Sequence, residues 1–374
     1  MNVLSIYYRH KPGGFCKRLY RSYEALARAG HTVHYISTEV LPVHHKSLVP
    51  HVMKLPFRNE KGLLFWPVFT LCAVFYMPYL TRKLNINTVF VMGSYYAFLS
   101  VLNKMLNGTA LATYIHACDT SYSHLIERRS FLIRFQAWYE HMAFLMSDLI
   151  LTINGNMKKD LEQRYAHSKI EVLPNNIDLP ELSGSDFRRE ISASAGAFLI
   201  ATSGVFTKGK NIDLLIRALF RAQLDDALLI IIGDVSTRDL DEKKKLKRLV
   251  ASLELSERVI FTGWRMDACD IVKSSDLFVL PSLSEGCPLS LLEALGLGVP
   301  CLGSRIPAVE EVLGYEELLF DPVKENELTQ KLLSSRDQKT LTRWRKLSEE
   351  RGAAYTFDWN NRFLDCLRRA HVAV

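Results

Sequence analysis

The sequence predicts an α/β protein of two domains, each built on a parallel β-sheet with helices on both faces. The chain of 374 residues is too long for one ordinary hydrophobic core, since single cores stop growing near about 250–300 residues. Its composition, 48% hydrophobic and 23% charged, is that of a globular protein. Short β-branched apolar runs alternate along it with helical stretches, which is typical of βαβ units.

The first part of the chain carries one set of these units. A helix is predicted in "CKRLYRSYEALARAG" (16–30). The predicted strands are "NVLSIYY" (2–8), "HTVHYIS" (31–37), "NTVFVMG" (87–93), "ATYIHA" (112–117) and "DLILTING" (148–155).

The pattern restarts after a polar, proline-bearing linker that runs from about Pro174 to Ser194. We place the domains at 1–178 and 179–357, and expect a ligand in the cleft between them, outside the carboxyl ends of the strands. The second set of predicted elements is "AFLIATSG" (197–204), the helix "KNIDLLIRALFRAQ" (210–223), "ALLIIIGD" (227–234), the helix "EKKKLKRLVASLEL" (242–255), "RVIFTG" (258–263), "LFVLPS" (277–282) and "PCLGS" (300–304).

Cysteine and charge limit the possible classes of function. The seven cysteines are scattered and form no CxxC pair, so neither a disulfide framework nor a zinc site is indicated, and a reducing cytosol fits best. The N-terminus has no long apolar core of a secretion signal. Residues 1–100 hold 12 Lys and Arg against 3 Asp and Glu, which favours an anionic partner on that side: a membrane surface, a nucleic acid or a phosphorylated substrate. A solvated basic surface is the alternative.

The uncharged run 63–80, "LLFWPVFTLCAVFYMPYL", is long enough for a membrane span. Two prolines, at 67 and 78, are expected to interrupt a helix, and the run lies within a βαβ pattern, so we interpret it as a domain helix. Its outer face, with Phe69 and Phe75 and the flanking Arg82 and Lys83, is predicted to dock in the membrane interface. Burial under another segment or in a dimer is the alternative.

The segment "SEGCPLSLLEALGLG" (284–298) carries two carboxylates around the start of a predicted helix. Backbone N–H groups at such a helix end attract a phosphate. Glu293, one turn inside, is placed to hydrogen-bond vicinal hydroxyls of a ribose, and Glu285, before the helix, to receive hydroxyls of the group attached to the phosphates. Solvated surface charges are the alternative, although an unpartnered Glu293 among so many leucines would be costly to bury.

This segment resembles the E-x7-E signature of the retaining glycosyltransferase family 4, whose GT-B fold consists of two Rossmann-like domains facing across a cleft. Further stretches resemble the family in the expected order, so the resemblance covers nearly the whole chain. They are "PGGFCKRLYRSYEALARAGHTVHYIS", "SDLILTINGNMKKDLEQRY", "KIEVLPNNID", "SGVFTKGKNIDLLIRAL", "IIGD", "RVIFTGW" and "SDLFVLPS". The resemblance also implies a C-terminal helix, about 358–374, that packs back onto the first domain.

The resemblance assigns roles around the signature. It implies that Glu285 binds the donor sugar, that Glu293 binds the nucleotide ribose, and that Lys210 neutralises the departing diphosphate, where negative charge grows as the glycosidic bond breaks. The turn between the two carboxylates would contact the donor through Gly286, Cys287, Pro288, Leu289 and Ser290.

Other parts of the predicted site lie further away along the chain. Gly13 and Gly14 match the family's glycine loop, where glycine permits close approach of the backbone to phosphates, and His116 aligns with a histidine near the anomeric carbon. A lone histidine is more often an ordinary hydrogen-bonded residue. Trp264 and Arg265 fall where the family meets the nucleobase, with core packing as the alternative for Trp264.

One position departs from the family pattern. Many members carry an arginine after the glycine equivalent to Gly204, as half of an Arg/Lys clamp on the diphosphate, whereas this chain has Val205. Lys208 is a candidate substitute, and the alternatives are that the donor is held differently or that activity is lowered.

The resemblance implies a metal-independent, retaining glycosyltransferase with no cofactor, using a nucleotide diphosphate-sugar, with a UDP-sugar favoured over a GDP-sugar. The expected acceptor is a lipid-linked or membrane-associated glycan of cell-envelope polysaccharide synthesis: lipopolysaccharide, capsule or exopolysaccharide. We expect a cytoplasmic protein held peripherally on an anionic membrane, on its inner face, with no nucleic-acid partner. Two alternatives stay open: a GT-B nucleotide-sugar 2-epimerase or hydrolase, and a non-catalytic protein that binds nucleotide-sugar.

Overall fold

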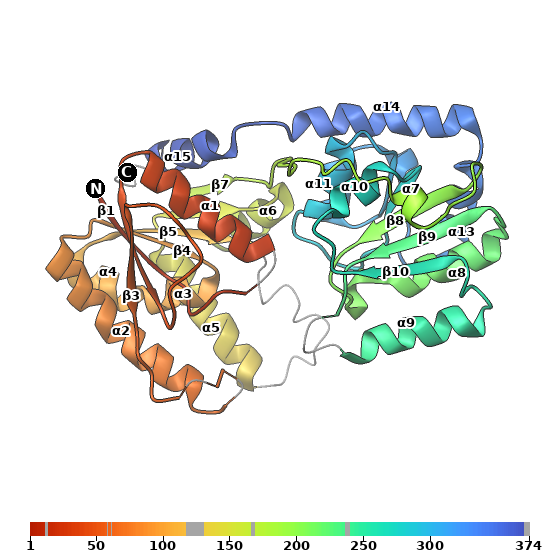
Figure 1. Cartoon of the computed structure of the whole chain (residues 1–374). Helices are drawn as coiled ribbons and strands as arrows, with labels where there is room; N and C mark the ends of the chain where they lie inside the picture. Colours follow the sequence, from red (N-terminus) through yellow and green to blue (C-terminus); the bar gives the residue numbers. More distant parts are fainter. Residues whose placement is uncertain are drawn as a thin grey trace. The chain divides into compact units, whose positions relative to one another are not determined.

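A computed structural model describes residues 1–11, 14–57, 59–60, 62–116, 131–165, 169–235 and 240–369. The chain forms two compact units, one of Met1–Pro174 with Asp358–Val374 and one of Asn175–Phe357. Each unit contains its own parallel sheet, so the predicted fold class is confirmed (Figure 1). The boundary expected after residue 178 lies inside the second unit.

The sheet of the first unit has the strand order β3-β2-β1-β4-β5-β6-β7, and every neighbouring pair is parallel. Its central strands are almost fully buried, as expected for a parallel sheet covered on both faces. The strands are β1 (Asn2–Ile6), β2 (Thr32–Ser37), β3 (Leu48–Val52), β4 (Thr88–Met92), β5 (Ala110–Ile115), β6 (Leu149–Thr152) and β7 (Lys169–Val172).

Helices cover both faces of this sheet. Figure 1 shows α1 and α15 on one side of the sheet and α2 to α5 on the other. The helix α15 packs on α1, and the fully buried Trp359 donates its indole N–H to the Pro174 carbonyl at 3.1 Å. The helices of this unit are α1 (Gly14–Arg28), α2 (Phe65–Leu84), α3 (Ser94–Leu99), α4 (Val101–Asn107), α5 (Phe131–Met146), α6 (Gly155–Arg164) and α15 (Trp359–Arg369).

The sheet of the second unit has the order β10-β9-β8-β11-β12-β13, again all parallel. The strands are β8 (Phe198–Ser203), β9 (Ala227–Ile232), β10 (Val259–Gly263), β11 (Leu277–Leu280), β12 (Cys301–Ser304) and β13 (Leu319–Phe320). The helices are α7 (Phe187–Glu190), α8 (Ile212–Ala222), α9 (Leu240–Ser252), α10 (Ala268–Lys273), α11 (Leu289–Gly296), α12 (Pro307–Leu313), α13 (Glu325–Ser334) and α14 (Gln338–Ala354), with 3₁₀ turns η2 (Lys208–Lys210) and η3 (Glu316–Leu318).

Each sheet has one point at which the strand order reverses direction. In the first unit it lies between β1 and β4, and in the second between β8 and β11. The loops after these strand pairs diverge toward opposite faces of the sheet, so a crevice opens outside the carboxyl ends, where α/β proteins bind ligands. The fold therefore points to the loops after β1 and β4 and after β8 and β11 as ligand sites.

The apolar run 63–80 forms most of α2, a helix within the first unit, as predicted. Among the described helices, none has the length and apolar character needed to cross a membrane. The expectation that prolines 67 and 78 interrupt the helix is wrong, since α2 continues through both. Pro67 stands in the first turn, where a backbone N–H has no helical acceptor anyway, and Pro78 is accommodated in the interior.

Candidate donor site

The site in the second unit begins at the turn that follows β8. Gly204 directly follows this strand with φ +156°, and a Cβ added there would lie 3.2 Å from Cε of Lys210. The backbone at Gly233, directly after β9, lies even closer to Gly204. A Cβ added at Gly233 would come within 2.1 Å of the Gly204 carbonyl oxygen. Glycine is therefore required at both positions, and it allows the Lys210 side chain to lie directly against the strand end.

Lys210 and Glu285 meet across the point where the strand order reverses. Lys210 follows β8 in the 3₁₀ turn η2, Glu285 follows β11, and the Lys210 Nζ lies 2.5 Å from the Glu285 Oε1. The Ser282 hydroxyl donates to the same carboxylate oxygen at 2.7 Å. The two charged side chains keep 24% and 12% of their surface exposed. The pair is thus neutral as a whole and partly accessible, and an arriving anion can compete for Lys210 while Glu285 turns to hydroxyl donors.

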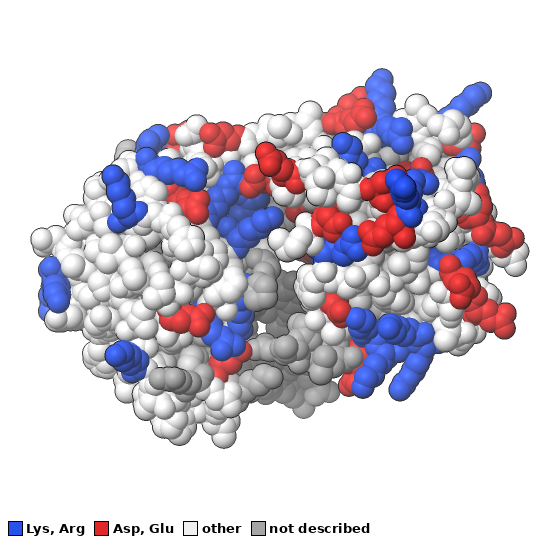
Figure 2. All heavy atoms as spheres, viewed as in Figure 1, with Lys and Arg blue, Asp and Glu red and all other residues white. Residues whose placement is uncertain are grey.

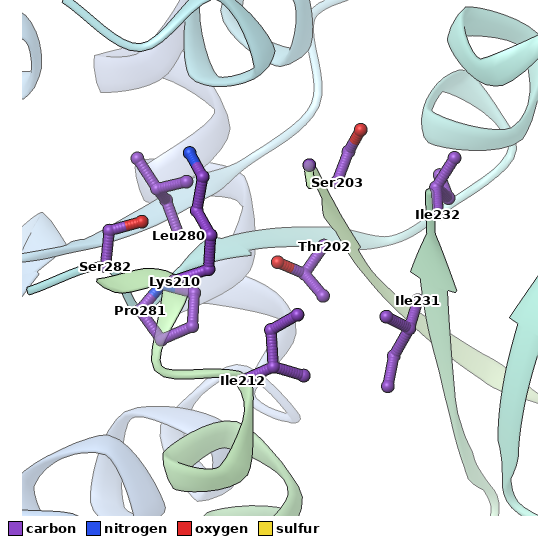
Figure 3. Close-up of a pocket in the computed structure, with 10 residues that line it drawn as sticks. Thr202, Ser203, Lys210, Ile212, Ile231, Ile232, Leu280, Pro281 and Ser282 are labelled. Carbon is purple, nitrogen blue, oxygen red and sulfur yellow. The ribbon is translucent and has the colours of Figure 1, made fainter. Parts of the chain in front are cut away.

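Beneath Lys210 lies a narrow cavity of about 10 Å³, enough for about one water molecule. Figure 3 shows the Lys210 side chain between Ser282 on one side and Thr202 and Ser203 on the other. The floor is apolar and includes Ile212. Contact of the lysine's aliphatic stem with this floor restricts where its ammonium group can lie.

The helix α11 begins at Leu289, four residues after Glu285. The first N–H bonded within the helix is that of Leu292, to the Pro288 carbonyl at 3.1 Å, so the N–H groups of 289–291 have no acceptor inside the helix. Glu293 lies one turn in and is half-buried. The turn between Glu285 and α11 is held in place through Cys287, which is buried and whose carbonyl accepts a hydrogen bond from the Asn175 side chain at 2.8 Å. Gly286, Pro288, Leu289 and Ser290 complete this predicted phosphate-facing segment.

The loop after β10 carries Trp264 and Arg265. Trp264 is 65% exposed, so core packing, the alternative considered for it, is wrong. Arg265 is bound to carboxylates of its own unit, with contacts of 2.7 Å to both Glu190 and Asp267. The hydrogen bond from Arg265, acting against burial, lowers the pKa of Asp267 to about 2. Arg265 therefore ties the loop after β10 to α7, and Trp264 is the exposed side chain of the two.

The position after Gly204 offers no cation. Val205 is half-buried, and Lys208 is exposed without an ion pair in the described portion of the chain. Lys210 is the basic side chain that lines the cavity and pairs with Glu285. The structure of the second unit brings three predicted parts of the site together at the carboxyl end of the sheet: Lys210, Glu285 and the start of α11.

In the first unit, His116 directly follows β5. Its ring lies 5.6 Å from the ring of Phe15 and 4.3 Å from that of Tyr114, measured between centroids. Both ring nitrogens are inaccessible to solvent and have no hydrogen-bond partner among the residues described. Burial, reinforced by the charge of Arg18, lowers the pKa of His116 to about 3, so the ring is neutral near pH 7. A neutral, unsatisfied imidazole at a strand end is suited to a hydrogen bond with a hydroxyl group.

The glycine loop before α1 is described only in part. Gly14 is the first residue of α1. Gly13 lies outside the described residues.

The predicted membrane residues divide into two groups. Phe69 is fully buried, so its assignment to the outer face of α2 is wrong: it belongs to the stripe at four-residue spacing that packs into the unit. Phe75 is 64% exposed, and Arg82 and Lys83 are exposed at the end of the helix.

Other exposed apolar side chains lie on α2, α4 and α5, helices that cover the same side of the sheet (Figure 1). They are Leu63, Leu64, Leu71 and Tyr79 from α2 and its approach, Met105 and Leu106 from α4, and Phe135 and Trp138 from α5. In the view of Figure 2, few charged side chains lie over α2 and α4.

Two family models match the chain. The model described as Glycosyltransferase Family 4 matches residues 12–181, and the model described as Glycosyl transferases group 1 matches residues 185–351. The solved structure of sucrose-phosphate synthase from Thermosynechococcus elongatus is similar over the whole of both chains, with a TM-score of 0.83 at 18% identity. That likeness gives the fold, which is GT-B, and the two matched models define a glycosyltransferase. The chain belongs to glycosyltransferase family 4, and the family inferred from the sequence is thereby confirmed.

Three curated relatives show the range of named activities nearby. N-acetyl-alpha-D-glucosaminyl L-malate synthase of Bacillus anthracis is 25% identical over 78% of this chain and 75% of its own length. N-acetylgalactosamine-N,N'-diacetylbacillosaminyl-diphospho-undecaprenol 4-alpha-N-acetylgalactosaminyltransferase of Campylobacter jejuni is 28% identical over 82% of each chain. UDP-Gal:alpha-D-GlcNAc-diphosphoundecaprenol alpha-1,3-galactosyltransferase of Escherichia coli is 33% identical over 45% of this chain and 46% of its own. Two of the three names specify a sugar transferase acting on an undecaprenol-diphosphate-linked sugar, and the first specifies the synthesis of an N-acetylglucosaminyl malate.

The sequence reasoning missed Ser282 and Gly233. A serine that ends a strand carries no distinctive signal, whereas glycine after "ALLIII", at the end of a buried strand, is a recognisable sign of close backbone approach.

Proposed function

We propose that this glycosyltransferase moves a sugar from a UDP-sugar, with retention of configuration and without a metal ion, to a lipid-linked glycan at the inner face of the cytoplasmic membrane. Cell-envelope polysaccharide synthesis is the process that this activity serves. The observation that carries the proposal is the Lys210–Glu285 pair at the reversal point of the second sheet, directly before the N-terminus of α11.

The donor is arranged by charge. Its diphosphate lies against the N–H groups of 289–291, which have no acceptor inside α11, and displaces Glu285 from Lys210. Its sugar hydroxyls then become the partners of Glu285. Glu293, one turn further along, accepts hydrogen bonds from the ribose. Trp264, exposed beyond β10, offers a ring face to the base. The named donor of the Escherichia coli relative supports uracil as that base.

The residues of this chain stabilise the leaving group. As the bond between the anomeric carbon and the diphosphate oxygen breaks, its electron pair stays on the diphosphate, next to the ammonium of Lys210 and the helix dipole. Retention places the new bond to the acceptor oxygen on the face that the diphosphate leaves, and the acceptor's proton passes to the departing diphosphate. Lys210 and α11 then supply the positive potential for which other glycosyltransferases use a divalent ion. His116, whose ring is neutral near pH 7, accepts a hydrogen bond from a sugar hydroxyl.

The acceptor and the membrane are linked in this proposal. Exposed apolar side chains on α2, α4 and α5, together with the basic composition of residues 1–100, suit insertion into an anionic bilayer surface. Two of the three relatives carry diphospho-undecaprenol or diphosphoundecaprenol acceptors in their names, and the Bacillus anthracis relative carries a soluble one. The exposed face is the feature that favours a lipid-linked acceptor here.

Thermal unfolding in the presence of UDP-, GDP- and ADP-sugars tests the donor. Tight binding to the folded state raises the apparent stability, by about 2.7 kcal/mol when the ligand is present at 100 times its Kd. A UDP-sugar should raise the melting temperature more than the others do. Selective stabilisation by a GDP- or ADP-sugar would contradict the proposed base.

A hydrolase or 2-epimerase on the same scaffold remains the second candidate, because the same pair would hold the same donor. The two are separated by following UDP release with and without acceptor lipid. Acceptor-dependent release supports transfer, and equal release without acceptor supports the second candidate. Binding without any release would leave the non-catalytic alternative.

A further inference from the structure

A second charged cluster lies at the reversal point of the other sheet, where the loop that follows β1 contacts the segment between β3 and α2. Glu60 is its centre, and it receives a hydrogen bond from the Tyr8 hydroxyl at 2.5 Å. Nη2 of Arg9 lies 2.9 Å from one Glu60 oxygen, and the Lys11 Nζ lies 3.6 Å from the other. The Lys11 ammonium also lies 4.8 Å from the centre of the Tyr8 ring. We call these four residues the basic clasp.

The clasp has one positive charge in excess. Glu60 is only 11% exposed, and although burial raises its pKa, the Tyr8 hydrogen bond and the charges of Lys11 and Arg9 give a net lowering, so it stays ionised. One carboxylate balances one of the two cations, whose side chains remain 40% and 38% exposed. Such a group of accessible basic side chains is chemically suited to an oxyanion.

One donor of the clasp is also unfilled. Nε of Arg9 is inaccessible to solvent and has no hydrogen-bond partner in the part of the chain that the structure describes. A guanidinium binds a phosphate best through two adjacent N–H groups, and an orphaned Nε indicates that one acceptor is missing.

The clasp lies between an apolar surface and the ring of His116. On one side the Tyr8 ring packs on Trp66 at 5.0 Å, at the start of α2, and Leu63, just before this helix, is 94% exposed. On the other side Tyr7 contacts Phe15 at 5.3 Å, and Phe15 contacts His116 at 5.6 Å, all between ring centroids. Tyr7 and Tyr8 are also in contact, so a continuous series of ring contacts runs from the start of α2, past the clasp at Tyr8, to the unsatisfied imidazole of His116.

We propose that Arg9 and Lys11 bind the phosphate of a lipid-phosphate-linked acceptor, with its hydrocarbon toward Leu63 and its glycan toward His116. In such a molecule the phosphate is the fixed charge between the lipid and the sugars, which is the same order as in the first unit. The inference rests on the proposed function, since it states how the lipid-linked acceptor is held. Glu60 and Tyr8 position the two cations and do not contact the phosphate.

Farnesyl diphosphate, a short soluble lipid diphosphate, is the probe. Its dissociation constant is measured by calorimetry for the full-length protein and for Arg9→Met and Lys11→Met, which keep the aliphatic stem and remove the charge. Each substitution should weaken binding by at least about tenfold, the effect of losing one charge-assisted hydrogen bond. Lys159→Met, at an exposed position of α6 in the same unit, is the matched control and should leave binding unchanged. Farnesol, which lacks the phosphates, should bind all four proteins alike.

UDP is titrated into the same four proteins. Its binding should be equal in all of them, because the donor site belongs to the second unit. Loss of UDP affinity in Arg9→Met would assign the clasp to the donor and overturn the inference. Unchanged farnesyl diphosphate binding in both clasp variants would also overturn the inference. If the same two variants then bound less well to phosphatidylglycerol vesicles in a sedimentation assay, Arg9 and Lys11 would contact bilayer headgroups instead of the acceptor.

The failure of the proposed function gives a different result. A protein that binds no UDP but binds farnesyl diphosphate through Arg9 refutes the donor and leaves the clasp intact. A protein that binds UDP and ignores farnesyl diphosphate refutes the clasp alone. Thermal unfolding of each variant confirms folding, and Lys11→Met decides the question if Arg9→Met does not fold.

Discussion

Lys210→Met tests whether the ammonium beside Glu285 stabilises charge that develops as the donor bond breaks. Lys210 lines the small cavity at the end of β8 and lies 2.5 Å from the Glu285 carboxylate. Removing one preorganised group of this kind lowers kcat by about 100- to 1,000-fold, or about 2.7–4 kcal/mol of transition-state stabilisation. Because 24% of the lysine side chain is exposed and solvent screens its charge, we expect the lower end, about 100-fold.

The effect on folding should be small by comparison. Partly exposed ion pairs contribute about 0–1 kcal/mol, so Lys210→Met should change the free energy of unfolding by no more than about 1 kcal/mol. Lys208→Met is the matched control, because Lys208 is exposed two residues earlier in the same 3₁₀ turn, and its kcat should change by less than about threefold. Turnover is measured as UDP release at saturating donor and acceptor. A near-normal kcat for Lys210→Met, or an equal loss in Lys208→Met, would refute the role given to Lys210.

Three further predictions follow from the positions of single side chains. Glu293→Ala should weaken UDP binding in calorimetry, whereas Glu285→Ala should spare it and lower turnover of the whole donor; equal losses of UDP affinity would contradict the assignment. Phe75→Ser should release the protein from phosphatidylglycerol vesicles with unfolding changed by less than about 0.5 kcal/mol, whereas Phe69→Ser, at a fully buried site, should cost about 3–5 kcal/mol; vesicle binding untouched by Phe75→Ser would count against the exposed face. Burial lowers the pKa of His116 from 6.5 to about 3. Between these two values the unfolded chain binds a proton at His116 and the folded protein does not, so the free energy of unfolding falls as the pH drops from about 6.5 toward 3. His116→Gln should reduce that loss of melting temperature between pH 7 and pH 5, and an identical slope would show that His116 does not titrate this way.

The proximity of Lys210 and Glu285 was predictable because parallel sheets bring distant strand ends together. Lys210 and Glu285 are 75 residues apart in sequence, yet both follow strands that the apolar pattern predicts, and the carboxyl ends of adjacent parallel strands share one edge. The helix after Glu285 and its exposed N–H groups were likewise predictable from the local sequence. What local sequence does not specify is the partner of each charge.

Arg265 illustrates this limit. The family resemblance implied a nucleobase role for Arg265, which stays a prediction. In the structure its guanidinium binds Glu190, 75 residues earlier, and Asp267. Arg305, directly after β12, likewise pairs with Glu316. Such pairings depend on how loops from separate strands approach, which the pattern of apolar residues does not encode.

The outer face of α2 shows a second limit. The helix is apolar almost all round, so its sequence contains no polar stripe that fixes which side faces the sheet. Phe69 and Phe75 were therefore equally good candidates for the outer face, and packing alone buries the first and exposes the second. The basic clasp escaped notice for the related reason that Glu60 lies in a loop about 50 residues from Arg9 and Lys11.

The central claim is that the Lys210–Glu285 site transfers a sugar with retention to a lipid-diphosphate acceptor. The most direct measurement incubates the protein with an α-linked UDP-sugar labelled with ¹³C at the anomeric carbon and a lipid-diphosphate-linked saccharide, and determines the anomeric configuration of the product by NMR. The account predicts acceptor-dependent formation of an α-linked product that is lost in Lys210→Met. A β-linked product, or free labelled sugar formed equally without acceptor, would contradict it.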